Sequence, residues 1–214
     1  MDRRSFLARL ARRGDLEIPR PPARADQPRG DLGDLLLETC AAGGCGVARV
    51  RGASAALEAA LSLLSREGIG RAGCADLGPE LMPLLPEVAA GYGVELVAAA
   101  DGRAEALALA EPLAAGLTIC ELAVAQTGGL VQAAGPGGGR ILSLLPPLHV
   151  ALVREADVLP DMAALARALI DQERFPLGPP ALALISGPSK TADIEGTMIR
   201  GVHGPGRVEL ILWS

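Results

Sequence analysis

Aromatic residues are scarce in this sequence: two Phe, one Tyr and one Trp account for 2% of its 214 residues. The core must therefore be filled by Ala, Leu, Val and Ile, and few rings are available to stack on nucleic-acid bases. The formal net charge is −5, which opposes the positive field that non-specific nucleic-acid binding requires. The composition thus argues against a nucleic-acid partner.

Long apolar runs are also missing. No stretch of about 18 uncharged apolar residues occurs, so we expect no membrane-spanning helix. Arg3 and Arg4, followed by Ser-Phe-Leu, resemble a twin-arginine export signal. However, Arg9, Arg12 and Arg13 interrupt the apolar stretch of roughly 7 to 15 residues that such a signal needs. We therefore predict a cytoplasmic protein.

Cysteine and histidine, the residues that most often hold metals, are few and poorly spaced for that purpose. The four cysteines include no CxxC pair, and the two histidines form no HxxxH pair. Free, mostly buried thiols in a reducing compartment are the simplest interpretation. We expect no metal site and no bound cofactor.

The chain divides into a short N-terminal segment, residues 1–30, and one domain, residues 31–214. Residues 2–13 place Phe6, Leu7 and Leu10 on one side of a predicted amphipathic helix, and a Pro-rich linker follows. This helix docks on a partner, docks on the chain's own body, or stays in solvent. The remaining length suffices for one core that buries about 70% of the unfolded surface.

From residue 31 onward, short apolar runs alternate with helical patterns. The predicted helices lie at 31–41, from an N-cap at Ser54 onward, and at 79–90, 104–115 and 161–172. The predicted strands lie at 45–50, 69–74, 94–99, 119–125, 129–133, 148–153, 181–185 and 208–212. Repeated βα units with nearly continuous apolar strands predict an α/β fold with a mainly parallel sheet and helices on both faces.

The first candidate motif for function runs from residue 116 to residue 129. It reads as an apolar strand that contains Glu121 and ends in a polar glycine turn at Gln126, Thr127 and Gly128. Ligands bind at such strand ends in open parallel sheets. A carboxylate in an apolar strand needs a partner, so Glu121 either contributes to a site or holds a neighbouring loop or arginine.

The second motif is a glycine-rich turn at residues 135–140 followed by SLLPPLH at residues 143–149. The glycines let the backbone approach a ligand, and Arg140 is suited to a bidentate grip on a carboxylate or phosphate. His149 begins a predicted strand. It either orients a ligand or shuttles a proton, or it binds a loop carbonyl in a purely structural role.

The third motif is SGPSKTADIE at residues 186–195, which we expect to open a helix or turn after a strand. Amides at such a terminus favour an anion. The candidate anion-binding residues are Ser186, Gly187, Ser189, Lys190, Thr191 and Asp193. The structural alternative is a helix start capped by Thr191.

The fourth motif, RGVHGP at residues 200–205, is a turn that carries His203 just before the last predicted strand. Nothing around it indicates a metal. The chain also contains no GxSxG nucleophile elbow and no Walker A spacing.

Together and in this order, the four motifs make the chain resemble the LUD-domain family and its lactate utilisation protein C (YkgG-like) branch. The usual pattern there is an acidic residue, A-E-T-G-[TS], a glycine turn with Arg, then SLLP and His. The acidic residue, the Gly of A-E-T-G and the Arg of the glycine turn are kept here at Glu121, Gly128 and Arg140, and SLLP and His stand at 143–149. The resemblance implies the fold of sugar-phosphate isomerases, formyltetrahydrofolate cyclo-ligases and CoA transferases.

Two positions depart from that family pattern. Gln126 stands where the family usually has Glu, and Gly129 where it usually has Thr or Ser. A glutamine cannot attack an acyl group or act as a general base. The resemblance therefore implies an accessory or ligand-binding subunit in oxidation of L-lactate to pyruvate, with iron–sulfur partner proteins and a small carboxylate or phosphate ligand. The alternatives are an acyl-transfer or cyclo-ligase-type enzyme and a non-catalytic interaction protein.

Overall fold

The computed structural model describes residues 30–99, 103–133, 139–170, 181–192 and 198–214. The predicted N-terminal helix and linker lie almost entirely outside these ranges. Within them, no helix has the length and apolar character needed to cross a membrane.

Six strands form the main sheet, and every neighbouring pair in it is parallel. They are β1 (Gly46–Val50), β2 (Arg71–Cys74), β3 (Glu95–Ala98), β4 (Ala115–Ile119), β7 (Leu148–Arg154) and β12 (Arg207–Trp213). Their order across the sheet is β1-β12-β7-β4-β2-β3. The predicted parallel α/β fold is therefore confirmed.

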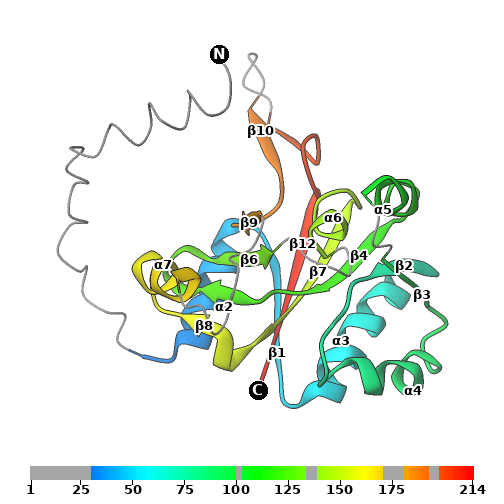
Figure 1. The fold of residues 1–214 in the computed structure, drawn as a ribbon, viewed down its shortest axis with the longest axis horizontal. Coiled ribbons are helices and arrows are strands. Elements are labelled where there is room, and N and C mark those ends of the chain that lie inside the picture. The colour runs from blue at the N-terminus through cyan, green and yellow to red at the C-terminus, as the bar shows by residue number, and fades with distance from the viewer. Residues whose placement is uncertain (1–29, 100–102, 134–138, 171–180, 193–197) are drawn as a thin grey trace, which may run out of the picture.

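Helices cover both faces of the main sheet, as Figure 1 shows. On one face lie α3 (Ala53–Arg66), the 3-10 turn η1 (Met82–Leu84) and α4 (Leu85–Ala89). On the other lie α2 (Leu32–Gly43), α5 (Arg103–Ala110) and α6 (Gly139–Leu142). Aliphatic side chains fill both interfaces, as the scarcity of aromatics requires.

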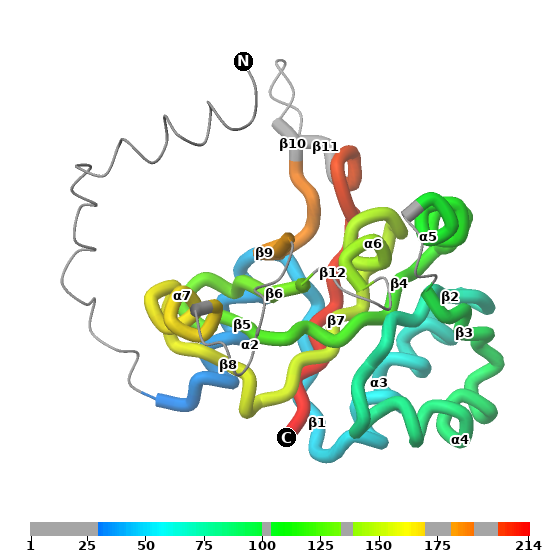
Figure 2. The backbone as a smooth tube through the Cα atoms, in the orientation of Figure 1, coloured from blue at the N-terminus to red at the C-terminus, as the bar shows by residue number. Residues whose placement is uncertain are grey.

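A second, four-stranded sheet packs beside α2 and is covered by α7 (Met162–Ile170). Its strands, in spatial order, are β8 (Val158–Leu159), β5 (Leu122–Val124), β6 (Gly129–Ala133) and β9 (Leu182–Ile185). The turn η2 (Ala125–Thr127) joins β5 to β6, and η3 (Glu155–Asp157) precedes β8. The backbone tube in Figure 2 shows this unit on the side of the main sheet opposite α3.

Several predicted elements are corrected by the structure. The strand expected at 119–125 is two strands, because Glu121 turns the chain out of the main sheet and β5 pairs with β6 instead. The helix expected at 104–115 ends at Ala110, since Ala115 already belongs to β4. Ser54 lies inside α3, whose N-cap is Gly52. The range 79–90 contains the 3-10 turn η1 followed by the short helix α4, in place of one long helix.

The third motif was predicted to open a helix or a turn after a strand. It continues into a β-hairpin of β10 (Lys190–Ala192) and β11 (Met198–Arg200) rather than a helix. The side chain of Thr191 and all of Asp193 lie outside the described part of the chain. In Figures 1 and 2 this hairpin projects from the body above β12. The alternative of a helix start capped by Thr191 is therefore wrong, and the anion site stays a prediction.

Two glycines, paired across neighbouring strands, allow α6 to lie close to the sheet. Gly73 of β2 pairs with Gly116 of β4, so the two share one face. A Cβ at Gly116 would overlap the carbonyl oxygen of Leu142, and one at Gly73 would overlap the Leu142 side chain. Because both positions lack a side chain, the backbone of α6 rests directly on the strands.

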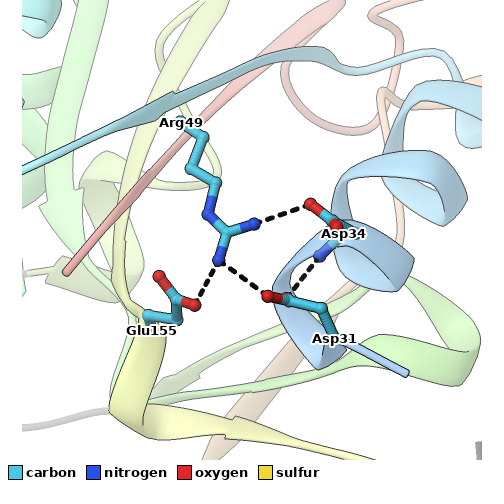
Figure 3. A network of polar contacts seen from close by, with 4 residues as sticks. All are labelled: Asp31, Asp34, Arg49 and Glu155. Atoms are coloured by element: carbon cyan, nitrogen blue, oxygen red, sulfur yellow. Dashed lines mark hydrogen bonds and ion pairs between the residues drawn. The ribbon is translucent and has the colours of Figure 1, made fainter. Parts of the chain in front are cut away.

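An ion-pair network ties α2 to the main sheet at the ends of β1 and β7 (Figure 3). The guanidinium of Arg49 contacts Asp34 at 2.6 Å, Asp31 at 3.1 Å, and Glu155. Asp31 also caps α2 by accepting a 3.0 Å hydrogen bond from the amide of Asp34. That amide bond, followed by the guanidinium, lowers the pKa of the Asp31 carboxyl.

Replacing Arg49 with glutamine should raise the pKa of Asp31 towards its ordinary value, because the cationic partner is lost while the amide bond remains. Carboxyl-carbon NMR titration measures this change directly. Arg51→Gln, two residues along and exposed, is the matched control and should leave that pKa unchanged. Equal effects from both variants would show that the network in Figure 3 does not govern Asp31.

Candidate functional site

The strongest concentration of polar side chains lies beyond the carboxyl end of β4. Glu121 follows that end, and its two carboxylate oxygens face β6. Oε2 accepts a 2.9 Å hydrogen bond from the amide of Ala133, and Oε1 accepts a 3.4 Å bond from the side-chain amide of Gln132. Glu121 therefore binds the neighbouring strand β6, rather than the loop or arginine that the structural alternative named.

From Glu121 a chain of polar contacts runs into the core, and we call it the polar chain. It comprises Glu121, Gln132, Cys120, Thr118 and His149. The Cys120 thiol approaches Gln132 Oε1 at 4.0 Å, and Cys120 lies two residues after Thr118 on the same face of the strand. Thr118 Oγ1 in turn lies 2.9 Å from Nε2 of His149. Only Glu121 among the five is not buried.

The alternating positions of β4 explain this arrangement. Gly116, Thr118 and Cys120 point to the same face, and His149 of β7 is the register partner of Gly116. Since Gly116 has no side chain, the imidazole can reach the hydroxyl two residues along. His149 therefore does not bind a loop carbonyl through Nε2, contrary to the structural alternative.

His149 is fully buried, and burial lowers the pKa of its imidazole to about 4. The ring is thus neutral at pH 7. Its second nitrogen, Nδ1, has no hydrogen-bond partner among the described residues. A buried polar atom left in this state costs about 1 to 3 kcal/mol, so a ligand group or water that reached it would be stabilised.

Arg140 enters the same region from α6. A Cβ on the preceding Gly139 would lie 2.7 Å from the side-chain nitrogen of Gln132, so the start of α6 abuts the polar chain. The hydroxyl of buried Ser143 donates to the carbonyl oxygen of Arg140 at 2.9 Å and fixes this turn. Within the described structure, Arg140 forms no ion pair.

Two small hollows open at the same edge of the main sheet. One, of about 200 Å³, is lined by Cys74, Ala75, Asp76 and apolar side chains, and Ala75 packs against Gly139. The other, of about 170 Å³, is lined in part by Arg154 and Trp213. Arg154 is already held there by two carboxylates, those of Glu80 and Asp157.

The predicted turn Gln126–Gly128 lies away from Glu121, at the opposite end of β5. Gln126 and Thr127 are exposed in η2. Gly128 adopts a left-handed conformation (φ 62°) and packs on α2, where a Cβ would lie 3.2 Å from the amide nitrogen of Cys40. This turn thus serves the contact between the second sheet and α2.

The predicted anion residues at 186–191 lie beside the carboxyl end of α2 and the segment before β12, away from the carboxyl ends of the main-sheet strands. Lys190 donates to the carbonyl oxygen of Gly43, at the end of α2, at 2.7 Å. Gly187 (φ 113°) packs on the same carbonyl, and the amide of Ser189 bonds Pro205. Ser186 and His203 are exposed. In the described structure, no hydrogen bond or ion pair joins these residues to the polar chain.

Sequence reasoning missed Gln132 as a site residue, and it treated Thr118 and Cys120 as ordinary strand positions. The signal that could have found them is the i, i+2 spacing of Gly116, Thr118 and Cys120, which places polar atoms on one face of a strand. Gln132 has no such signal, because its position depends on how β6 folds back onto β5.

The comparisons with known proteins identify the family. The LUD domain model matches residues 34–213, most of the chain. The chain belongs to the LUD domain family. Among curated relatives of this LUD domain protein, lactate utilization protein C of an Exiguobacterium species is 43% identical over 98 residues, 45% of this chain and 43% of that protein.

Two further relatives match at the same level. Lactate utilization protein C of Macrococcus caseolyticus and the uncharacterized protein YkgG of Escherichia coli are each 39% identical over 106 residues, 48% of this chain. Each of these matches spans less than half of the relative's own length, 45% in both cases.

A solved structure supports the fold of this LUD domain protein. The crystal structure of a DUF162 family protein from Deinococcus radiodurans superposes with a TM-score of 0.61 over 87% of this chain and 99% of that one. The two sequences are 22% identical. The match concerns the arrangement of strands and helices alone.

Proposed function

We propose that this protein is a ligand-binding LUD domain that serves lactate utilisation. The observation that carries the proposal is its similarity to lactate utilization protein C, at 39% identity or more, in two curated relatives. In this proposal it acts as an accessory subunit in oxidation of L-lactate to pyruvate. The redox chemistry then belongs to iron–sulfur partner proteins.

The proposed ligand is a small carboxylate or phosphate at the carboxyl edge of the main sheet. Three features support this place. Arg140 directly follows Gly139, Gly139 lies against Ala75 of the hollow of about 200 Å³, and it also lies against Gln132 of the polar chain. Arg140 supplies the charge that grips the anion. The amide of Gln132, oriented by Glu121, adds a neutral donor that fixes the ligand's orientation.

The same geometry supports binding more than acyl transfer. The carboxylate of Glu121 accepts hydrogen bonds from the side-chain amide of Gln132 and the backbone amide of Ala133. These bonds suit a residue that positions its neighbours. Gln126, at the family's usual Glu position, is exposed at the far end of β5 and cannot ionise. A nucleophile for a covalent intermediate would therefore have to come from elsewhere.

A ligand-binding screen tests the proposal. L-lactate, pyruvate, sugar phosphates, CoA, ATP and folates are added to the purified protein, and thermal unfolding is followed. A ligand at about 100 times its dissociation constant should stabilise the fold by about 2.7 kcal/mol. We expect Arg140→Ala to weaken binding about 10- to 100-fold, because a charged hydrogen-bonding pair is lost.

Arg167→Ala removes the same charge from α7, away from the carboxyl edge, and is the matched control. It should bind like the wild type. If no carboxylate or phosphate stabilises the wild type, or if both variants weaken binding equally, the proposed site is wrong.

A further inference from the structure

One of the two hollows at the carboxyl edge of the main sheet is not part of the site proposed beside Arg140. It measures about 170 Å³, and its lining residues differ from those of the hollow near Gly139. Its walls come from residues 77–80, which follow β2, from the last residues of β4, β7 and β12, and from Asp157. Four neighbouring strands of the sheet therefore end around it.

The connections of the main sheet make this position a favourable one for a ligand. From β2 the chain proceeds to β3 on one side, whereas from β4 it proceeds, by way of the second sheet, to β7 on the other side. Because β2 and β4 are neighbours, the direction of the chain reverses between them. Ligands of open α/β sheets bind in the crevice that such a reversal opens at the carboxyl ends of the strands. Residues 77–80 and Ile119 place the hollow at this reversal.

The indole of Trp213 forms part of the wall. This side chain is only 4% exposed, and its Nε1 has no hydrogen-bond partner among the described residues. A buried donor without an acceptor is rare in a native protein. Apolar packing alone leaves the indole N–H unpaired, whereas a ligand oxygen in the hollow supplies the missing acceptor.

The charged groups around the hollow argue against an anion as its ligand. Arg154 is the register partner of Trp213 on the neighbouring strand, so both side chains lie on the same face of the sheet. The guanidinium is paired with Asp157 at 2.9 Å through Nε and with Glu80 at 2.7 Å through Nη1. One positive charge thus faces two negative charges, and a further carboxylate would be repelled.

The two carboxylates have different tasks. The side chain of Asp157 is 12% exposed and fixes the orientation of the guanidinium, whereas that of Glu80 is 51% exposed. Glu80 bonds Arg154 through Oε1. Its second oxygen, Oε2, has no hydrogen bond in the described structure and is able to accept one from a ligand.

We propose that this hollow binds a small uncharged ligand in which an acceptor oxygen lies next to an O–H or N–H donor. The oxygen accepts a hydrogen bond from Trp213 Nε1, and the donor bonds the carboxylate of Glu80. Amides and vicinal diols both present this pair of groups. The volume is several times the roughly 30 Å³ that one water molecule occupies in the liquid, so it admits a molecule with a few carbon atoms.

The test uses the indole of Trp213 as a reporter. Trp213 is the only tryptophan in the sequence, so its indole N–H gives a single resonance in a proton–nitrogen NMR spectrum. The probes are lactamide, propane-1,2-diol and L-lactate, which share a carbon skeleton and differ in polar group and charge. We expect an uncharged probe to shift this resonance in a saturable titration, and L-lactate to leave it in place. The probe that shifts it shows whether the ligand group is an amide or a diol.

Variants assign the two contacts. Trp213→Phe keeps an aromatic ring without the donor, and it should weaken binding of the uncharged probe about 3- to 10-fold, as expected for one neutral hydrogen bond. Saturation-transfer NMR on the probe measures this affinity, because the indole signal is gone. Glu80→Ala should weaken binding by a similar factor, and it carries the test alone if Trp213→Phe does not fold. Glu87→Ala removes an exposed carboxylate from α4 and is the matched control.

The proposal is overturned if neither uncharged probe shifts the indole resonance, or if L-lactate shifts it as much as they do. It is also overturned if either Trp213→Phe or Glu80→Ala binds the probe as tightly as Glu87→Ala does. Arg140→Ala should leave these titrations unchanged, so failure of the anion site beside Arg140 is distinguished from failure of this one.

Discussion

Replacing Gly116 with alanine should lower the free energy of unfolding by about 3 kcal/mol or more, the upper end of overpacking costs. The added Cβ would overlap the carbonyl oxygen of Leu142 and lie 2.9 Å from its carbonyl carbon. These are backbone atoms, so no rotamer change relieves the clash. The whole of α6 would have to lift from the sheet, which disturbs Arg140 as well.

Urea denaturation at pH 7 measures this change. Gly70→Ala is the matched control, because a Cβ at Gly70 meets nothing within 4 Å, and it should shift the stability by less than about 1 kcal/mol. If Gly116→Ala does not yield folded protein while Gly70→Ala does, the expectation also holds. Equal stability of the two variants would show that α6 does not rest on β4 as described.

The second large effect concerns pH. Burial lowers the pKa of His149 from 6.5 to about 4. Between these values the unfolded chain binds a proton at this position and the folded chain does not, so stability falls as the pH drops from about 6.5 to about 4. The slope for one proton is about 1.4 kcal/mol per pH unit, and the total is on the order of 3 kcal/mol.

His149→Gln should abolish this slope, because a glutamine amide can still bond Thr118 but does not titrate. Denaturant unfolding at a series of pH values measures it, and His203→Gln, which changes the exposed histidine, should keep the wild-type slope. The carboxyls of Asp31 and Glu67, whose pKa values are lowered by their partners, lose their contributions in a lower range, near and below pH 4.5. A slope that persists in His149→Gln would contradict a buried neutral imidazole.

Much of the fold followed from local patterns. Alternating apolar strands and helices predicted the parallel sheet, and most strands lie close to their expected positions. The errors occurred where a long-range partner overrides local preference. The run 119–125 reads as one strand, yet it divides at Glu121, because β6 offers its carboxylate an amide that the main sheet does not. Likewise, residues 190–192 pair with β11 instead of opening a helix.

The candidate site, like the fold, was predicted only in part from local sequence patterns. Sequence by itself determined that Glu121, Arg140 and His149 carry unusual chemistry for their surroundings, because charged or titratable groups next to apolar strands need partners. It also determined family membership, through motifs that follow one another along the chain. What it left open was which of these groups share a place in the folded protein.

Only the tertiary structure decided that question. It joined Glu121 to His149 through Gln132, Cys120 and Thr118, and it placed the motif at 186–191 beside the carboxyl end of α2, away from the carboxyl ends of the main-sheet strands. It also fixed the ammonium of Lys190 on the carbonyl oxygen of Gly43, which is far away along the chain. The physical reason is that strand register and helix packing, set by contacts between distant segments, determine which side chains meet.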